Sequence, residues 1–547
     1  MKNIFIIILS AFSLFFISCE KQLDEYNPSG LTAEAVYTTP SGFDALVNAA
    51  YGYQRWWYGK EEGYNISETG TDIWTSAAGD VWPDLSKYAN LQSTNTALRD
   101  EWNALYAGIN LCNAGINRIQ DAGYTVGLRK QREAELKFLR AFYYWHIVET
   151  WGGVHFTTEE TKGIISTANK TPVETFYNLI FEDLQFASTN LANTTTDYGR
   201  VTRPAAMAFL ARMYLTRGKN AEANSMANAV INGGFGYVLQ PKYGDLFLMA
   251  NNKSKEVLYA VNYANNLTLN DIRSSTFPQG HSRGSNNGHL HFTMKYDDRP
   301  RMFRITEYGR PFNRYMPTRA LLDLYGPADA RYEGSFQEIY FSCTATGGVS
   351  RPGDTAVIAT RTNYAGTPGG NPGGTYVVYN RNNIYDAASG KVKNTLNYPT
   401  LTKHLDPTRL TFNEAQSEKD VFVIRLAEVY LIAAEAQYNL GKLDSAAYFM
   451  NIVRTRAAKP GQTAAMQVTS SQITLDFILD ERAREFAGEQ LRWFDLKRTG
   501  KLISRIQALN PDAAPNIQAY HTIRPIPQSQ LDAVTNRTEF TQNTGYQ

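Results

Sequence analysis

The sequence predicts a mainly α-helical protein, in which helical hairpins similar to tetratricopeptide repeats carry a loop-rich region with a few short strands. Apolar residues recur at helical three- and four-residue spacings within residues 30–233 and 416–547. Between about 234 and 415, Gly, Pro, Asn and Thr accumulate and the periodicity weakens. Apolar residues make up 43% of the 547 residues, which is enough to bury a large core. We expect one domain over residues 19–547.

Residues 1–18 have the pattern of a secretory signal peptide. A basic start at Lys2 precedes an apolar run over residues 4–17, which is too short to span a bilayer comfortably. Ser18 and Cys19 then end the run in a pattern that resembles a bacterial lipobox. We expect Cys19 to carry the lipid, because several acyl chains at one residue anchor a protein stably in a membrane. The alternative is an ordinary signal peptide with an incidental cysteine.

Two segments predict long amphipathic helices. Residues 133–153 place apolar side chains such as Leu136 and Leu139 on one face and end at Gly152. Residues 171–191 repeat the pattern, and there we expect Thr171 as the N-cap and Pro172 at the first helical position.

Two further segments predict helical hairpins of about the length of one tetratricopeptide unit. Residues 203–219 and 220–235 are expected to form a pair hinged at Gly218, and residues 421–442 and 443–458 a second pair hinged at Gly441. Small residues recur where the two helices of each pair must approach closely.

The loop-rich region predicts only short strands, at residues 256–261 and 375–379. Irregular segments of this length in a compact protein are usually functional. We therefore expect this region to contribute to ligand binding.

Charge and cysteine usage exclude several functions. The formal charge is +2 without a basic run, so nothing predicts a nucleic-acid partner. Beyond Cys19 only Cys112 and Cys343 remain, which gives no zinc cluster, and Cys112 is expected to be buried. His289 and His291 could share one face of a strand, but no third ligand follows at a useful spacing. We predict no metal and no cofactor.

Catalytic motifs are weak. Residues 280–284 match the G-x-S-x-G pattern of a nucleophilic serine, but the apolar strand and helix that such a serine requires do not flank them. The acid pairs Glu61-Glu62 and Asp297-Asp298 could be invoked for glycoside hydrolysis, although nothing in the sequence sets the separation of their carboxyl groups. We do not expect an enzyme.

Aromatic residues, at 13% of the chain, favour a binding function instead. A sugar ring has an apolar face and a polar rim, so its site needs a flat aromatic surface edged by polar side chains. Residues 67–85 offer Trp74 and Trp82 in polar surroundings, with Asp72 and Asp80 two residues before them. This is the first candidate site, and burial of the two tryptophans in a core is the alternative.

Residues 283–299 form the second candidate site. Their polar and aromatic side chains suited to a sugar are Asn286, Asn287, His291 and Tyr296. By contrast, Trp56, Trp57 and Trp145 lie in apparently helical sequence and are expected to pack the scaffold.

Several motifs, in order along the chain, carry a resemblance to a known family. They are LDEYNPSG at 23–30, AELKFLRAFYYW with WGGV, LAEVYLIAAEA, ERAREFAGEQLRWFDLKRTGKL at 481–502, and IRPIPQSQLD with FTQNTGY at the C-terminus. The sequence resembles the SusD/RagB family, surface lipoproteins of Bacteroidetes that bind nutrients, usually glycans. The resemblance implies a helical scaffold with an irregular ligand-binding region. It also implies a SusC-like TonB-dependent transporter as partner in the outer membrane.

The sequence and the resemblance leave three classes of function to separate. The main expectation is a lipid-anchored protein on the cell surface that binds oligosaccharides, with peptides as the alternative ligand. A lipoprotein hydrolase would release reducing ends, and a pure interaction scaffold would bind no small ligand.

The charged residues of the 481–498 motif are expected to form ion pairs inside the scaffold rather than a catalytic site. They are Glu481, Arg482, Glu485, Arg492 and Asp495. The same motif contains Trp493 and Phe494, which we expect in the core.

The lipid anchor can be tested with Cys19→Ser. Because the serine hydroxyl does not replace the thiol in lipoprotein acylation, the variant should lose both the lipid and its surface location. Metabolic labelling with an acyl-chain probe measures this. Undiminished labelling of the variant would contradict the prediction.

Overall fold

The computed structural model describes residues 36–264, 266, 285–344, 354–364 and 376–546. Cys19 and the 280–284 motif lie outside these residues, so their predicted roles stay predictions. Within the described part of the chain, no helix combines the length and the apolar character that a membrane span requires.

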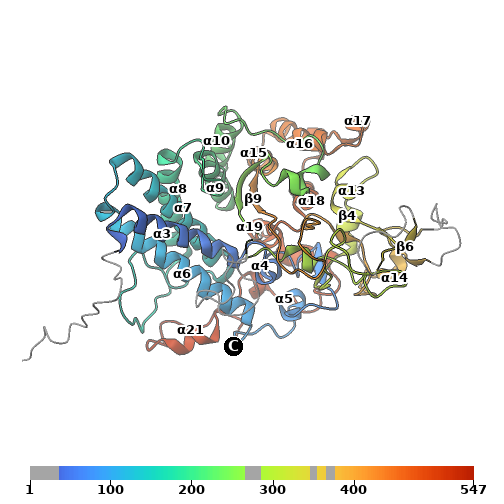
Figure 1. Ribbon diagram of the computed structural model, residues 1–547, viewed down its shortest axis with the longest axis horizontal. Coiled ribbons are helices and arrows are strands. Elements are labelled where there is room, and N and C mark those ends of the chain that lie inside the picture. Colours follow the sequence, from blue (N-terminus) through green and yellow to red (C-terminus); the bar gives the residue numbers. More distant parts are fainter. Residues whose placement is uncertain (1–35, 265, 267–284, 345–353, 365–375, 547) are drawn as a thin grey trace, which may run out of the picture.

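The helical scaffold is built from both ends of the described chain (Figure 1). Its first helices are α3 (Pro40–Gly52), α4 (Glu61–Ser67), α5 (Pro83–Lys87), α6 (Thr96–Arg118), α7 (Val126–Trp151), α8 (Val173–Asn190), α9 (Arg203–Thr216) and α10 (Asn220–Ile231). Its last helices are α15 (Leu426–Asn439), α16 (Leu443–Ala457), α17 (Thr463–Met466), α18 (Leu475–Phe486), α19 (Arg492–Arg498), α20 (Leu502–Leu509) and α21 (Gln528–Ala533). Short 3-10 turns include η3 (Tyr53–Trp56), which follows α3, and η5 (Gly244–Phe247).

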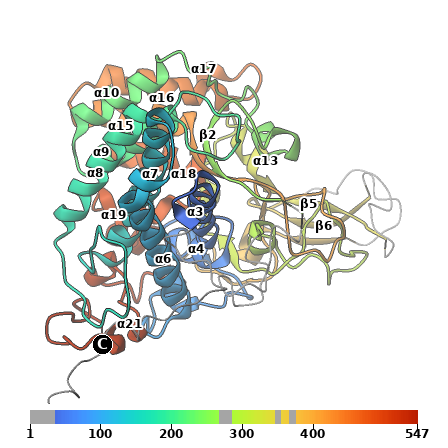
Figure 2. The same cartoon turned by 60° about the vertical axis from the view of Figure 1, so that its left-hand side comes forward.

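The scaffold helices pack in a continuous row. Helix α7 packs between α6 and α8, α8 on α9, α9 on α10, α10 on α15, and α15 on α16 (Figures 1 and 2). Helices from the two halves of the chain therefore meet at the contact of α10 with α15. Both expected hinges are confirmed, because Gly218 and Gly441 adopt positive φ angles of 69° and 73° between the helices of their pairs.

Two local predictions were wrong. Residues 421–425 form the strand β9 (Val421–Arg425) and not the start of a helix, because their apolar side chains are buried between β2 and the scaffold. Helix α8 begins at Val173 with Pro172 as its N-cap, while the Thr171 hydroxyl donates a hydrogen bond to Asn169 Oδ1 and caps nothing.

The loop-rich region contains short elements only. Its helices are α11 (Gly288–His291), α12 (Arg319–Asp323), α13 (Arg331–Ser335) and α14 (Arg381–Ile384). The strands of the protein are β1 (Trp74–Ser76), β2 (Val257–Val261), β3 (Tyr315–Pro317), β4 (Phe336–Gln337), β5 (Ile339–Phe341), β6 (Thr355–Ala359), β7 (Val377–Tyr379), β8 (Thr400–Leu401) and β9. Strands β1 and β3, β2 and β9, and β4 and β8 form antiparallel pairs, whereas β6 pairs antiparallel with β5 and parallel with β7.

The β2–β9 pair joins the two ends of the loop-rich region. Val257 lies opposite Arg425 and Val261 opposite Val421, and both strands are buried against α9. The predicted strand at 256–261 is thus confirmed to within one residue. The pair also sets where the end of β2 emerges at the surface.

Two main hydrophobic cores support the structure. The larger one fills the helical scaffold and includes Trp57, Trp145, Trp493 and Phe494, which confirms their expected role in packing. The other lies under the loop-rich region and contains Trp74 from β1. The segment around β1 therefore packs with the loop-rich region as well as with the neighbouring helix α5.

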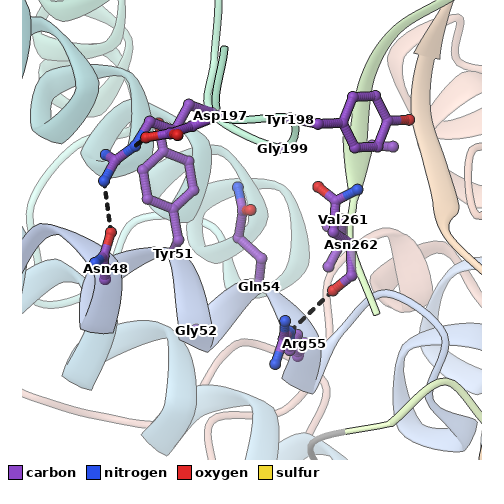
Figure 3. A pocket seen from close by; sticks show the side chains of 12 residues that line it. Asn48, Tyr51, Gly52, Gln54, Arg55, Asp197, Tyr198, Gly199, Val261 and Asn262 are labelled. Atoms are coloured by element: carbon purple, nitrogen blue, oxygen red, sulfur yellow. Dashed lines mark hydrogen bonds and ion pairs between the residues drawn. The ribbon is translucent and has the colours of Figure 1, made fainter. Parts of the chain in front are cut away.

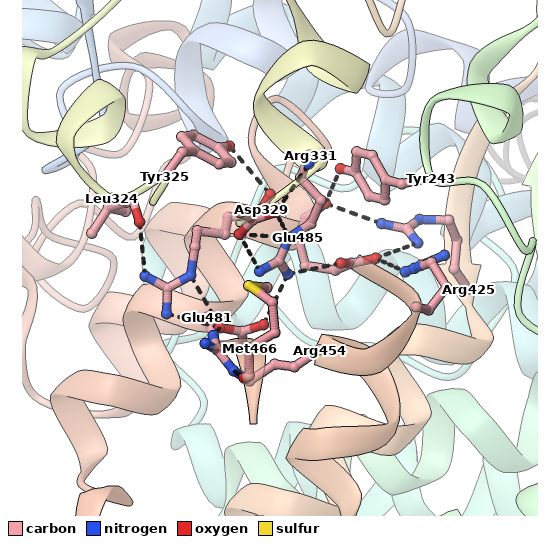
Figure 4. Close-up of polar contacts among 12 residues, drawn as sticks. Tyr243, Leu324, Tyr325, Asp329, Arg331, Arg425, Arg454, Met466, Glu481 and Glu485 are labelled. Carbon is pink, nitrogen blue, oxygen red and sulfur yellow. Dashed lines mark hydrogen bonds and ion pairs between the residues drawn. The ribbon is translucent and has the colours of Figure 1, made fainter. Parts of the chain in front are cut away.

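A buried ion-pair cluster joins the two cores (Figure 4). Arg331 of α13 contacts Glu481 and Glu485 of α18 at 2.9 and 3.1 Å, and Arg425 of β9 contacts Glu485 at 3.1 Å. Arg454 of α16 contacts Glu481 at 2.6 Å. All these side chains are almost completely buried. The expectation that the motif charges form ion pairs within the structure is confirmed.

The cluster predicts loss of stability in acid. Burial raises the pKa of Glu485, but the guanidinium groups of Arg456, Arg425 and Arg331 outweigh burial and hold it at about 2, below its ordinary 4.5. The ionised carboxylate thus stabilises the folded state above pH ~4.5, and this stabilisation is lost as the pH falls toward 2. We expect the free energy of unfolding to drop by on the order of 3 kcal/mol from this group alone over that range.

Urea denaturation at a series of pH values measures this effect. Glu485→Gln should be less stable than the wild type at neutral pH and should show a shallower fall of the unfolding free energy in acid. An equally steep fall in both proteins would rule out Glu485 as its source.

Candidate functional site

Trp74 lies in a core and does not form the exposed aromatic surface that its sequence context predicts. It pairs with Pro317 across the β1–β3 ladder and is fully buried. Its ring packs edge-on against Phe292 at 4.8 Å and stacks on Phe336 at 6.4 Å between ring centroids. The expectation of a surface platform at Trp74 is wrong, because the polar residues around it are themselves buried.

Asp72 is also buried and belongs to an ion-pair network. Its Oδ2 lies 2.6 Å from Arg492 Nη2 and 2.7 Å from Arg505 Nε. Burial raises the pKa of Asp72, but the two guanidinium groups outweigh it and hold the pKa below its ordinary value. The carboxylate is therefore ionised and fully engaged in holding the C-terminal motif, and it is not available to a ligand in this structure.

Asp80 and Trp82 lie together in one surface turn. Asp80 Oδ1 accepts hydrogen bonds from the Trp82 backbone N–H and from Asn65 Nδ2, both at 3.0 Å. Asp80 Oδ2 accepts from the hydroxyls of Ser76 and Ser86. Trp82 is half-buried and donates its indole N–H to Thr96 Oγ1 at 2.9 Å. Asp80 thus holds the turn, and a ligand contact at Trp82 stays a prediction.

The side chains proposed for the second site, which the structure describes from residue 285 onward, are buried. Asn287, His291 and Tyr296 are all buried, and Tyr296 donates to Gly309 O at 2.6 Å while stacking on Tyr340. His289 and His291 belong to the helix α11 and not to a strand. Within the described residues, no group of three or more His, Cys, Asp or Glu side chains has the arrangement of a metal site.

Glu61, Asp297 and Asp298, three of the four residues in the acid pairs, form ion pairs. Glu61 Oε1 lies 2.6 Å from Arg314 Nε, and Asp297 contacts both Lys295 and Arg304. Asp298 pairs with Arg299 at 2.7 Å. These contacts give the three carboxylates a structural role.

A groove around Tyr198, here called the Tyr198 groove, is a candidate site that combines an exposed aromatic residue with polar walls. It consists of two adjoining hollows of about 380 and 410 Å³ that share Tyr198, Gly199, Arg200 and Ala260 in their walls. Each volume is in the range of small-molecule sites. The two hollows therefore offer room for neighbouring units of an extended ligand.

Four chain segments build the groove. The end of α3 and η3 supply Asn48, Tyr51, Gln54 and Arg55, and the α8–α9 loop supplies residues 193–202. Residues 235–237 and the segment 253–262, which contains β2, complete it. In Figure 3, Gln54 points upward between the side of the hollow formed by Tyr51 and the side formed by Tyr198 and Asn262.

Tyr198 is held on the groove with its ring partly in solvent. The residue is 42% exposed, and its hydroxyl donates to Asn252 O at 2.9 Å. Lys253 Nζ lies 4.8 Å from the ring centroid. The next residue, Gly199, has φ of +99°, and a Cβ there would lie 1.9 Å from Asn262 Oδ1. Only glycine allows the loop to bring Tyr198 this close to Asn262.

Gln54 offers an unused donor at the floor of the first hollow. The residue is only 2% exposed, and its Oε1 accepts from the Tyr259 hydroxyl at 2.7 Å. Its Nε2 has no hydrogen-bond acceptor among the described residues. A buried amide N–H is stabilised by a partner, so Gln54 favours a ligand with an oxygen acceptor.

The arginines of the groove differ in how they are held. Arg200 contacts Glu135 at 2.7 Å, Asp197 at 3.1 Å and Asn48 Oδ1 at 2.7 Å, so that it fixes the wall. Arg55 donates from Nε to Asn262 O at 3.1 Å (Figure 3). Its guanidinium lies over the Tyr263 ring. The groove thus combines an aromatic face with amide and guanidinium donors, which is the chemistry of a sugar site.

Sequence reasoning missed the Tyr198 groove. Its only local signal is an aromatic residue within the polar run at 192–200, between two predicted helices. The remaining walls come from segments far apart in the chain, and no spacing rule connects them. The prediction placed the site at residues 67–85 because of their tryptophans, although most of that segment is buried in the structure.

Comparisons with known proteins agree with one another. The model of the SusD family matches residues 179–546, and a model described as "Starch-binding associating with outer membrane" matches residues 23–215. The chain is 27% identical to SusD-like protein P25 of Formosa agariphila over 100% of this chain and 99% of the relative. It is 24% identical to the starch-binding protein SusD of Bacteroides thetaiotaomicron, over 88% of this chain and 85% of that protein.

Solved structures show the same fold. A laminarin-binding SusD-like protein superposes with a TM-score of 0.70 at 23% identity, covering 92% of this chain and 99% of that one. Surface glycan-binding protein A from Bacteroides fluxus superposes with a TM-score of 0.68 at 18% identity, with the same coverage. At these identities the likeness concerns the fold.

Asp72→Asn tests whether this residue is structural. The substitution leaves Arg492 and Arg505 buried without their counter-charge, so we expect a loss of about 3–5 kcal/mol in unfolding free energy. Asp323→Asn is the control, because its ion pair with Arg381 is partly exposed to solvent and is expected to contribute about 1 kcal/mol or less. Thermal and urea unfolding measure both. Wild-type stability of Asp72→Asn would contradict the structural role.

Proposed function

The chain belongs to the SusD family, and on this premise we propose that it binds an oligosaccharide at the cell surface and passes it to a SusC-like TonB-dependent transporter. In this proposal Cys19 carries the lipid that anchors the protein to the outer membrane. The names of its relatives, which are starch-binding, laminarin-binding and surface glycan-binding proteins, support a glycan as the ligand. The protein acts by binding and not by catalysis.

The observation that carries this proposal is the partly exposed ring of Tyr198 between two hollows edged by hydrogen-bonding groups. The apolar face of a sugar ring stacks on an aromatic ring, while Gln54, Asn48 and Asn262 lie where they can meet its hydroxyls. The length of the groove suits more than one sugar unit. Trp82, half-buried in its turn, is a second candidate contact.

Binding at this groove is expected to be modest. An open groove leaves part of the sugar in water, and only the surplus over the costs of association appears as affinity. We therefore expect dissociation constants from micromolar to millimolar for short oligosaccharides, on the order of −4 to −8 kcal/mol.

The ligand class is tested by screening the purified protein against a glycan array and a peptide library. Tyr198→Ala and Trp82→Ala are then compared by isothermal titration with the best ligand. Tyr198→Ala should weaken binding by about tenfold, since it removes the stacking surface, and should leave the melting temperature unchanged because Tyr198 is exposed. Trp82→Ala should weaken binding severalfold if the ligand reaches the turn at Asp80.

Tyr448→Ala is the matched control, because Tyr448 is a 64% exposed tyrosine on α16, outside the groove. It should bind as the wild type does. Hits on the peptide library alone would replace the oligosaccharide by a peptide. Wild-type affinity in both Tyr198→Ala and Trp82→Ala would place the site elsewhere.

A further inference from the structure

The Tyr198 groove has an excess of positive charge in its walls. Arg55 lines the first hollow, and Lys253 and Lys255 line the second. Among the described residues none of the three forms an ion pair, whereas Arg200 is engaged by Glu135 and Asp197. The whole chain carries a formal charge of only +2, so this excess is local.

Carboxylates are scarce in the groove. Asp197 is the one acidic residue among the described walls of the two hollows, and it pairs with Arg200 at 3.1 Å. The second hollow has no acidic residue among its described walls. The one negative charge in these described walls is thus already paired with an arginine, and the walls would not repel an anionic ligand.

Asp420 is the nearby carboxylate that could offset the cations, but it lies under the surface. It is 8% exposed, and its Oδ1 accepts the Tyr263 backbone N–H at 3.0 Å. Burial raises its pKa to about 6, while Lys253 and Arg55 lower it. At neutral pH Asp420 is therefore mostly ionised, and from below the surface it offsets part of the charge of Lys253 and Arg55.

The cations lie beside surfaces that suit a sugar ring. Lys253 Nζ lies over the Tyr198 ring, 4.8 Å from the ring centroid, and β2 forms an apolar floor at residues 257–260. Phe235 and Tyr237 add aromatic walls, and Thr194 and Thr195 add hydroxyls. A ring that stacks here would carry its substituents into reach of ammonium groups.

We propose that the Tyr198 groove selects acidic oligosaccharides, in which carboxylates or sulfate esters on the sugar units contact Lys253, Lys255 and Arg55. This inference rests on the proposed function and specifies its ligand class. Opposite charge at the groove speeds encounter with an anionic chain and disfavours other partners more than it adds raw affinity. Gln54 Nε2 donates to a carboxylate, sulfate or hydroxyl oxygen alike.

Matched ligand pairs test the charge requirement directly. A uronic acid oligosaccharide is compared with its carboxyl-reduced form, and a sulfated oligosaccharide with its desulfated form, by isothermal titration at low and high salt. We expect at least one charged member to bind about tenfold more tightly than its neutral partner, and the difference to shrink in high salt. The pair that shows it identifies the source of the anion. Equal affinities within both pairs would overturn the inference.

Charge-removing variants locate the effect. Lys253→Gln with Lys255→Gln should reduce the affinity for the charged ligand about tenfold, bring it near that of the neutral partner, and leave the melting temperature unchanged. Lys130→Gln is the control, since Lys130 is an exposed lysine at the start of α7, outside the groove. An unchanged preference for the charged ligand in the double variant would overturn the inference.

The two proposals fail in different ways. If neutral and charged ligands bind equally and Tyr198→Ala weakens both, the groove binds oligosaccharides without charge selection. If Tyr198→Ala changes the affinity for no glycan, or if no member of either pair binds, the groove is not the sugar site. The proposed charge selection is then wrong as well.

Discussion

Glu481 and Glu485 of α18 place two carboxylates in the protein interior, where guanidinium groups from three other elements surround them. Arg331 comes from the loop-rich region, Arg425 from β9 and Arg454 from the scaffold. Removal of one partner would leave a buried charge uncompensated at a cost of about 3–5 kcal/mol. The pairs thus form only when scaffold and loop-rich region are docked in one geometry, and they make that geometry specific.

The same network reaches the candidate site through the β2–β9 pair. Glu256, just before β2, contacts Arg425 at 2.6 Å and Arg456 at 2.8 Å. These contacts fix the start of β2, and the ladder to β9 fixes its course to Val261. Ala260, Val261 and Asn262 then form a wall of the Tyr198 groove. The groove therefore depends on rigid strands, while Tyr198 itself lies on a loop that Gly199 and Asn252 hold in place.

The remaining walls of the groove show how one surface combines two kinds of recognition. Tyr198 and the floor of β2 provide area for stacking, which is insensitive to charge. The cations beside them, which form no ion pair among the described residues, provide long-range attraction, which salt screens. Stacking positions the sugar ring, and the cations discriminate among its substituents. The two contributions to affinity should therefore be separable in titrations at different salt concentrations.

The sequence by itself determined the features that depend on neighbours along the chain. Helical periodicity located α7 through α10 and α15 with α16, and Gly218 and Gly441 marked the turns because only glycine adopts their backbone angles readily. The charges of the 481–498 motif could be assigned to ion pairs, because acids and arginines alternate there as ion pairs within a helical scaffold require, and its aromatic residues could be assigned to a core. Strand β9 escaped this reasoning, since a short apolar run next to a helix has no period of its own.

Only the tertiary structure decided which polar segments are exposed. The polar sequence around Asp72 and Trp74 predicts exposure, yet both residues are buried. Arg492 and Arg505, some 420 residues or more away, supply the ion-pair partners that allow Asp72 to be buried. The Tyr198 groove likewise joins segments between residues 48 and 262 that no local pattern links. Burial and concavity arise from contacts between distant segments, and local composition carries no record of which segments will meet.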